Sequence, residues 1–182
     1  MDKLAKLNKT ILKCTKCELC ESRINAVPGE GAKNAEVILI GEAPGKNEDE
    51  EGRPFVGRAG KTLDEVLAEL SIPRENLYIT NILKCRPPKN RVPKKPEVEA
   101  CIDYLFKQIE LIQPQIIVTL GQSALKTLTG LKGNLRDFHG NKYEFNNYPV
   151  LVTYHPAAVV YNRNLKSELV NDLKNIKSII EK

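Results

Sequence analysis

Short apolar segments, each bounded by a turn, constrain the fold of this chain more than any other feature of its sequence. Four apolar residues stand together at Val37–Ile40, and similar runs occur at Leu77–Asn81, Ile116–Leu120 and Val150–Thr153. Runs of this length are typical of strands buried on both faces of a sheet. Segments with apolar residues at helical spacing separate them. Alternating strands and helices predict an α/β fold with a parallel sheet that helices cover on both faces.

The expected helices have apolar residues that return every three or four positions. They lie near Leu4–Lys13, Thr62–Leu70, Glu97–Ile112 and Lys166–Ile180, with a short one after Gly121 and a further short strand at Lys142–Phe145. A chain of 182 residues suits one domain, residues 1–182. Since no apolar run approaches the roughly 18 residues that span a bilayer, and no signal peptide is recognisable, we expect a cytoplasmic protein without a membrane partner.

Polar side chains stand where the predicted strands end. Glu42 follows the first strand, Asn81 ends the second, the Gly121–Ser123 turn follows the third, and His155 follows the last. Ligands of parallel α/β sheets bind beyond the carboxyl ends of the strands, so we expect these groups to meet at one edge. A carboxylate, an amide and an imidazole together indicate an active site. His139 has no partner at ligand spacing, and we expect it to be structural or exposed.

Five cysteines in a chain of this kind favour metal ligation over a disulfide framework. Cys14 and Cys17 form a C-x2-C pair, whose thiolates can reach one metal from a tight turn. Cys20 either extends this pair to a ferredoxin-like run or faces away as a small apolar group. Cys85 and Cys101 are separated by fifteen residues. This spacing leaves a four-cysteine iron–sulfur cluster and a less usual zinc site as alternatives, and Cys101 also fits a core position.

A proline-rich basic loop, Cys85–Pro96, lies between two of these candidate ligands. A metal centre at its ends would order the loop, and an ordered basic loop is suited to contact a DNA backbone. The formal net charge of +5 permits nucleic-acid binding without specifying it. The abundance of lysine and glutamate is typical of proteins from thermophiles.

Four motifs carry a resemblance to a known family. They read GEAPG at Gly41–Gly45, GRPFVGRAG at Gly52–Gly60, TNILKCRPPKNR at Thr80–Arg91 and HPAA at His155–Ala158. In this order and with this spacing, they resemble the iron–sulfur class of uracil-DNA glycosylases, family 4, over nearly the whole chain. The resemblance implies a three-layer α/β/α sandwich with a central four-stranded parallel sheet, a 4Fe–4S cluster and monofunctional removal of uracil from DNA.

The resemblance also implies which cysteines hold the cluster. The matching positions are Cys14, Cys17, Cys85 and Cys101, and Cys20 stays outside the set. Polar positions that the family links to its pocket are matched by Glu48 and Asn90.

For the reaction, the resemblance implies that the target nucleotide is flipped out of the helix and that Phe55 stacks on the uracil. The Asn81 amide would donate to uracil O4 and accept from N3–H, a pattern that cytosine inverts. His155, with backbone N–H groups near Glu42 and Ala43, would stabilise the negative charge on O2. Glu42 would position water and favour the sugar cation. Glu48 or the loop near Phe55 would crowd the C5 methyl group of thymine.

Beside this pocket, we assign the acidic residues Asp49, Glu50 and Glu51 to a solvated face. We expect a monomer whose partner is uracil-containing DNA, double- or single-stranded. Two alternatives remain: a glycosylase of the same superfamily with a broader range of bases, and a non-catalytic iron–sulfur DNA-binding module. The second has no need for Glu42, Asn81 and His155 together at one edge.

Overall fold

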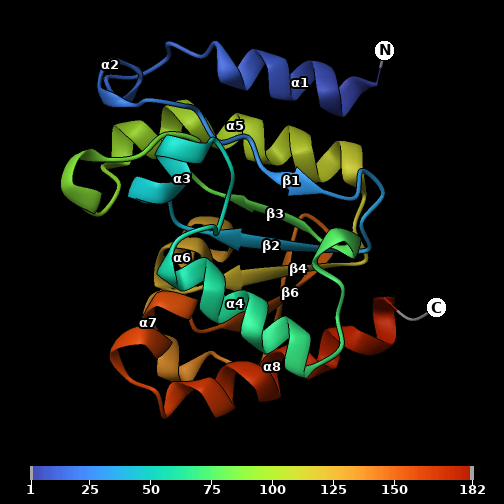
Figure 1. Ribbon diagram of the computed structural model, residues 1–182. Helices are drawn as coiled ribbons and strands as arrows, with labels where there is room; N and C mark the ends of the chain where they lie inside the picture. The colour runs from blue at the N-terminus through green and yellow to red at the C-terminus, as the bar shows by residue number, and fades with distance from the viewer. Residues whose placement is uncertain (1, 181–182) are drawn as a thin grey trace.

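The computed structural model describes residues 2–180, and a single mixed sheet runs through their centre (Figure 1). Within these residues the sheet has six strands in the order β1-β3-β2-β4-β6-β5. The strands are β1 (Glu30–Gly31), β2 (Val37–Gly41), β3 (Tyr78–Asn81), β4 (Ile116–Leu120), β5 (Lys142–Phe145) and β6 (Tyr148–Thr153). The four central strands are parallel, as predicted, and β1 and β5 add an antiparallel strand at each edge.

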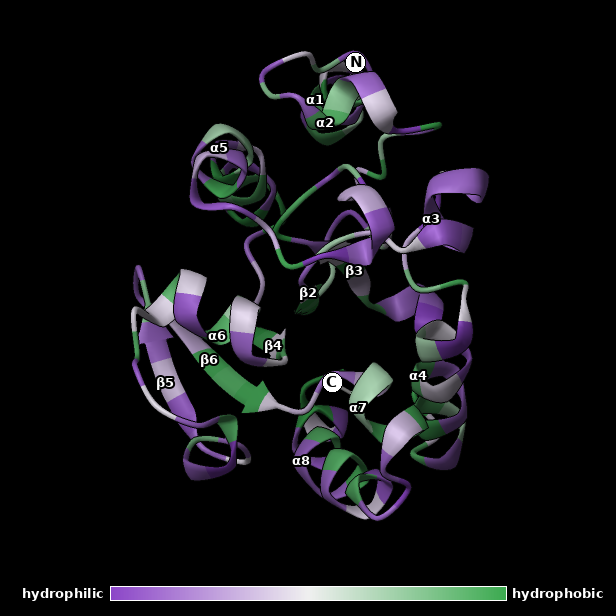
Figure 2. Ribbon diagram, turned by 90° about the vertical axis from the view of Figure 1, so that its left-hand side faces the viewer, coloured by the Kyte–Doolittle hydropathy of each residue, from purple (hydrophilic) through white to green (hydrophobic). Residues whose placement is uncertain are grey.

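The central strands are buried because helices cover both of their faces. Every residue of β2, β3 and β4 is buried, whereas β5 alternates exposed and partly buried residues. Figure 2 shows the same contrast between the hydrophobic β6 and the mostly hydrophilic β5. The predicted three-layer α/β/α sandwich is therefore confirmed. The helices are α1 (Lys3–Leu12), α2 (Leu19–Ser22), α3 (Lys46–Glu51), α4 (Arg58–Glu69), α5 (Lys95–Ile112), α6 (Gln122–Thr129), α7 (Pro156–Tyr161) and α8 (Leu165–Ile180).

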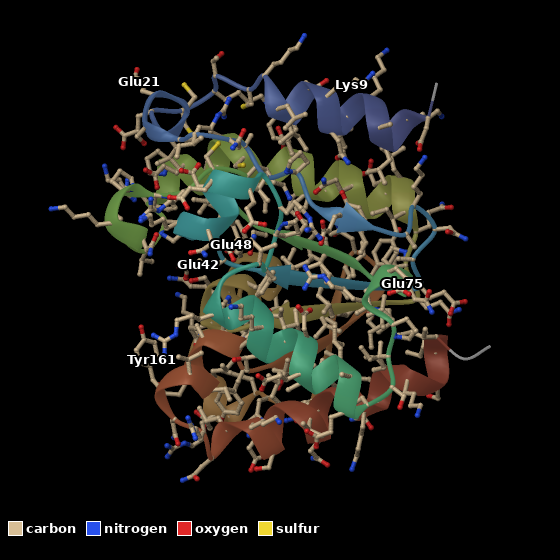
Figure 3. The ribbon with its side chains drawn as sticks, viewed as in Figure 1. Lys9, Glu21, Glu42, Glu48, Glu75 and Tyr161 are labelled. Carbon is tan, nitrogen blue, oxygen red and sulfur yellow. The ribbon has the colours of Figure 1, made fainter. Side chains whose placement is uncertain are left out.

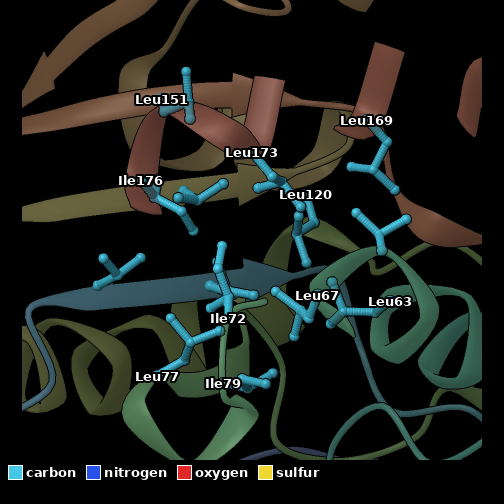
Figure 4. Close-up of a cluster of buried hydrophobic side chains, with 14 of the residues drawn as sticks. Leu63, Leu67, Ile72, Leu77, Ile79, Leu120, Leu151, Leu169, Leu173 and Ile176 are labelled. Carbon is cyan, nitrogen blue, oxygen red and sulfur yellow. The ribbon is translucent and has the colours of Figure 1, made fainter. Parts of the chain in front are cut away.

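Alternate residues of one strand enter two separate cores, since successive side chains of a strand point to opposite faces. Val37 and Leu39 of β2 pack with α4 and α8, in the cluster drawn in Figure 4. Ile38 and Ile40 pack with α5 and α6 on the other face. Each fully buried side chain of this size contributes about 1.5–3 kcal/mol by leaving water.

The winding of the chain reverses around β2. From β2 the chain passes through α4 to β3 on one side, and from β3 it passes through α5 to β4 on the other side of β2. Loops that leave the carboxyl ends of neighbouring strands diverge at such a point and leave a crevice. This arrangement places the candidate site beside the ends of β2, β3, β4 and β6.

A third, smaller hydrophobic cluster attaches the N-terminal helices to α5. Ile11 and Leu19 pack there with Leu83, Tyr104 and two cysteines, Cys85 and Cys101. The cysteine sulfurs are therefore part of a buried cluster, close to the end of β3. Among the described residues, no helix is long and apolar enough to cross a membrane.

The prediction for the acidic run was wrong at Asp49. The run forms α3, and Asp49 is only 2% exposed, whereas Glu50 and Glu51 are exposed as predicted. Asp49 Oδ1 accepts hydrogen bonds from the backbone N–H groups of Ile24 (2.9 Å) and Asn25 (3.3 Å). A buried carboxylate needs such donors, and here they come from a segment that is distant in sequence.

Candidate active site and cysteine cavity

A cavity of about 350 Å³ opens at the carboxyl ends of the parallel strands. It brings together every predicted site residue other than the cysteines. Those lining it are Glu42, Ala43, Pro44, Gly45, Glu48, Phe55, Ala59, Asn81, Pro87, Asn90, Arg91, His155, Ala157 and Tyr161. In Figure 3, Glu42, Glu48 and Tyr161 lie on the side of the molecule toward which β2 and β4 point in Figure 1.

Phe55 forms one wall of the cavity and is held in an unfavourable backbone conformation. Its φ of +50° lies in the left-handed region, and the residue is 4% exposed. The guanidinium of Arg74 donates to the carbonyl oxygens of Pro54 (2.7 Å) and Phe55 (3.3 Å). Such strain persists where surrounding contacts over-determine the backbone, and it is concentrated at functional sites. The Phe55 ring centroid lies 5.5 Å from that of His155.

Glu48 fixes the loop that carries Phe55. Its Oε1 accepts from the backbone N–H groups of Val56 (2.9 Å) and Gly57 (2.8 Å), and its Oε2 accepts from that of Gly45 (3.1 Å). Both carboxylate oxygens are thus occupied by backbone donors. Glu48 joins the start of α3 to the Phe55 loop while also lining the cavity.

Asn81, the last residue of β3, has a buried acceptor that no described residue satisfies. The residue is 2% exposed, and its Oδ1 lacks a hydrogen-bond partner within residues 2–180. A buried, unsatisfied acceptor costs about 1–3 kcal/mol. Gly41 permits the close packing here, because a Cβ at that position would lie 2.4 Å from Asn81 Oδ1 and 2.6 Å from Phe55 Cζ.

His155 caps the N-terminus of α7, and this contact determines which ring nitrogen carries the proton. Its Nδ1 accepts from the Ala157 N–H at 3.1 Å. Burial lowers the pKa of His155 to about 4, although the nearby Glu48 carboxylate opposes the shift. The ring is therefore neutral at pH 7. Because Nδ1 is an acceptor, the proton of the neutral ring lies on Nε2, which is a hydrogen-bond donor.

Glu42 is half-buried, directly after β2, and is tied to α6. One carboxylate oxygen, Oε2, accepts a hydrogen bond from the Ser123 hydroxyl. The backbone carbonyl of Glu42 accepts from the Leu83 N–H at 3.1 Å, which aligns the residue with the segment leaving β3.

The basic loop approaches the cavity at Asn90, whose Oδ1 accepts from Arg86 Nε at 2.7 Å. Arg91 forms a two-point ion pair with the buried Glu97, with N–O distances of 2.5 and 2.9 Å. Hydrogen bonds from Arg91, with a further one from the Lys94 backbone N–H, lower the pKa of Glu97 to about 2. These contacts hold the basic loop against the first turn of α5.

A second cavity is lined by all five cysteines: Cys14, Cys17, Cys20, Cys85 and Cys101. This cavity is small: only about 10 Å³ of its volume can hold the centre of a water molecule. The thiols form no disulfide, and no group of three or more Cys, His, Asp or Glu in residues 2–180 has metal-binding geometry. Arg23 Nη1 donates to Cys85 Sγ at 2.9 Å, and the Lys84 N–H donates to Cys101 Sγ at 3.3 Å.

Comparison with known proteins decides the family. The model of the uracil-DNA glycosylase superfamily matches residues 28–174. The chain belongs to this superfamily. Among its relatives, the type-4 uracil-DNA glycosylase of Sulfurisphaera tokodaii is 46% identical, over 98% of this chain and 86% of its own. The type-4 enzymes of Archaeoglobus fulgidus and Thermotoga maritima are 44% and 41% identical, each over 97% of this chain and over 92% and 94% of their own.

In this member of the superfamily, two residues that support the site from outside the cavity lining were not predicted from the sequence. Arg74 supports the Phe55 loop, and Ser123 holds Glu42. Ser123 stood in the turn expected at the sheet edge, so its position was indicated but its contact was not. Arg74 lies in a short connection between α4 and β3, and nothing in its local sequence signals its partners.

Proposed function

We propose that this chain is a monofunctional uracil-DNA glycosylase that acts in DNA repair. It flips uracil out of DNA and hydrolyses the N-glycosidic bond, leaving an abasic site. The observation that carries the proposal is the buried, unsatisfied Oδ1 of Asn81, a residue that lines one cavity together with Phe55 and His155. The type-4 relatives, named for the same activity, support it.

The Asn81 amide matches the edge of uracil. Its Oδ1 accepts from uracil N3–H, and its Nδ2 donates to O4, while the base lies against Phe55. Cytosine presents an acceptor at N3 and a donor at C4, so it leaves both groups of the amide unpaired. A site built to pair a polar edge rejects the mismatched base by a large factor, because buried polar groups are then left without partners.

The bond that breaks joins uracil N1 to the sugar C1′. Its electron pair leaves with the base, and negative charge develops on O2. The neutral His155 donates from Nε2, and the backbone N–H groups at Glu42 and Ala43 are further donors to this charge. Positive charge develops on the sugar, where the Glu42 carboxylate stabilises it and orients the water that adds to C1′. The proton released by that water passes to the carboxylate.

The gathering of cysteines from three separate segments around one cavity supports a 4Fe–4S cluster that Cys14, Cys17, Cys85 and Cys101 would hold. Burial raises the pKa values of Cys17, Cys85 and Cys101, so these thiols require a cationic centre to bind as thiolates. Such a cluster would supply a four-point cross-link between the N-terminal segment, the basic loop and α5. Arg23 is a charged donor to one of the sulfurs.

Iron and sulfide analysis tests the cluster. We expect a brown protein with broad visible absorbance and about four irons per chain. A colourless protein that holds stoichiometric zinc would contradict this assignment. Cys85→Ser should reduce the iron content, whereas Cys20→Ser should leave it unchanged, since Cys20 is not assigned as a ligand.

Excision assays test the activity. Uracil opposite guanine, uracil opposite adenine and single-stranded uracil should all be cleaved, with Asn81→Ala and His155→Ala slower by about 10²–10³-fold. Asn171→Ala, which changes an exposed asparagine away from the cavity, serves as a matched control. Wild-type rates in both site variants would refute the proposal. Cleavage of thymine opposite guanine, or of hypoxanthine, would indicate the broader-range alternative.

A further inference from the structure

The contact between Ser123 and Glu42 joins two elements that are remote in sequence. Ser123 is the second residue of α6, and its hydroxyl donates to Glu42 Oε2. Glu42 lines the cavity, whereas Ser123 does not. Within residues 2–180, no donor contacts the other oxygen of the carboxylate, Oε1. One oxygen is therefore held by the protein and one is available to a molecule in the cavity.

The first turn of α6 is itself held against the segment that carries His155. Gly121, which precedes α6, has a φ of +92°, and its N–H donates to the Thr153 carbonyl at 2.9 Å. A Cβ at Gly121 would lie 2.9 Å from the Cβ of His155. Because only glycine permits this approach, Ser123 and His155 keep a fixed spatial relation.

A glutamate side chain with one anchored oxygen has far fewer conformations than a free one. The free form must lose this rotational freedom during the reaction, at a cost of about 1–2 kcal/mol for a long polar side chain. The other anchors available in this region act on the backbone of Glu42, through the Leu83 N–H. The Ser123 hydroxyl is thus the group that orients the carboxylate itself.

We propose that Ser123 is a positioning residue for base excision, and this rests on the proposed function. Its hydroxyl fixes Glu42 so that Oε1 holds the attacking water while His155 stabilises the leaving uracil. In the step, the water oxygen bonds to C1′ as the C1′–N1 bond breaks. The bond's electron pair leaves with the base, and the water proton moves to Glu42.

Single-turnover excision of uracil tests this role in four proteins: the wild type, Ser123→Ala, Ser123→Thr and Ser178→Ala, an exposed serine of α8 as control. Loss of a hydrogen bond to a charged group should slow Ser123→Ala by about 10- to 100-fold at saturating enzyme, with unchanged affinity for uracil-containing DNA. Ser123→Thr keeps the hydroxyl and should stay within about threefold of the wild type. Matching melting temperatures and visible spectra verify the fold.

A double-mutant cycle separates positioning from a general structural effect. In a Glu42→Ala background the carboxylate is absent, so adding Ser123→Ala should slow excision by less than about twofold. Equal losses in the two backgrounds, or a wild-type rate for Ser123→Ala, would overturn the role of Ser123 and leave the proposed function intact. A wild-type protein that excises no uracil would overturn both.

Discussion

The protonation state of His155 gives the sharpest prediction of this structure. An ordinary histidine has a pKa near 6.5, and burial lowers that of His155 to about 4. The difference corresponds to about 3 kcal/mol against protonation. The Ala157 N–H, which points at Nδ1, opposes the same proton. His155 should therefore stay neutral, with its proton on Nε2, throughout the range from pH 5 to 8.

Excision rates and nitrogen NMR spectra both report the protonation state of His155. Protonation of His155 should not lower the single-turnover rate between pH 7.5 and pH 5.5. With a pKa of 6.5 for His155, the rate at pH 5.5 would instead be about tenfold lower. The chain has only two histidines, so comparison with His139→Gln assigns both imidazole spectra. A titration midpoint near 6.5 for His155, or a proton on Nδ1, would refute the argument.

The lowered pKa of His155 also makes the stability of the fold depend on pH, in a direction that can be worked out. Because the folded-state pKa is below the unfolded value, the unfolded chain binds more protons between about pH 6.5 and pH 4. The contribution of neutral His155 is fully present above pH 6.5 and is lost as the pH falls toward 4. Urea unfolding should show this loss in the wild type and not in His155→Gln.

Three further substitutions test individual contacts. Asp49→Ala leaves two backbone N–H groups unpaired and should cost about 1–3 kcal/mol of unfolding free energy in urea, whereas the exposed Glu50→Gln should change it by less than about 0.5 kcal/mol. Glu97→Gln should lower stability at pH 7; since the pKa of Glu97 is about 2, the gap from the wild type should close as the pH falls from about 4.5 to 2. Tyr161, 91% exposed beside the cavity, should be neutral for stability when changed to Ala but should weaken DNA binding in fluorescence anisotropy.

Elements with strong apolar periodicity were predictable from the sequence. The strand expected at Ile116–Leu120 has the same bounds in the structure, and the helix expected at Glu97–Ile112 begins only two residues earlier, at Lys95. Two of the elements that were missed, β1 and α3, lack this signal. β1 has only two residues, and α3 consists entirely of polar residues that hold their position through capping and through distant contacts.

The candidate site likewise has a part that the sequence predicted and a part that it did not. The rule that ligands bind at the carboxyl ends of parallel strands placed Glu42, Asn81 and His155 together, because it depends only on strand order. The supporting contacts depend on which side chains meet after folding. The Glu42–Ser123 bond joins residues 81 positions apart, and no local pattern in the sequence specifies such a pair.

The end of β3 explains why a site made of loops can be rigid. Asn81 and Cys85 lie on one short segment, and Lys84 between them is fully buried. Its Nζ lies 2.6 Å from Thr80 Oγ1, 2.7 Å from the Asn81 carbonyl oxygen and 2.8 Å from Gln108 Oε1. Burial lowers the pKa of Lys84 to about 7. A buried polar group that loses a hydrogen-bond partner is costly in either protonation state, so this arrangement disfavours any shift of the segment. The backbone that presents the Asn81 amide is thereby fixed to α5 and to the cysteine cavity.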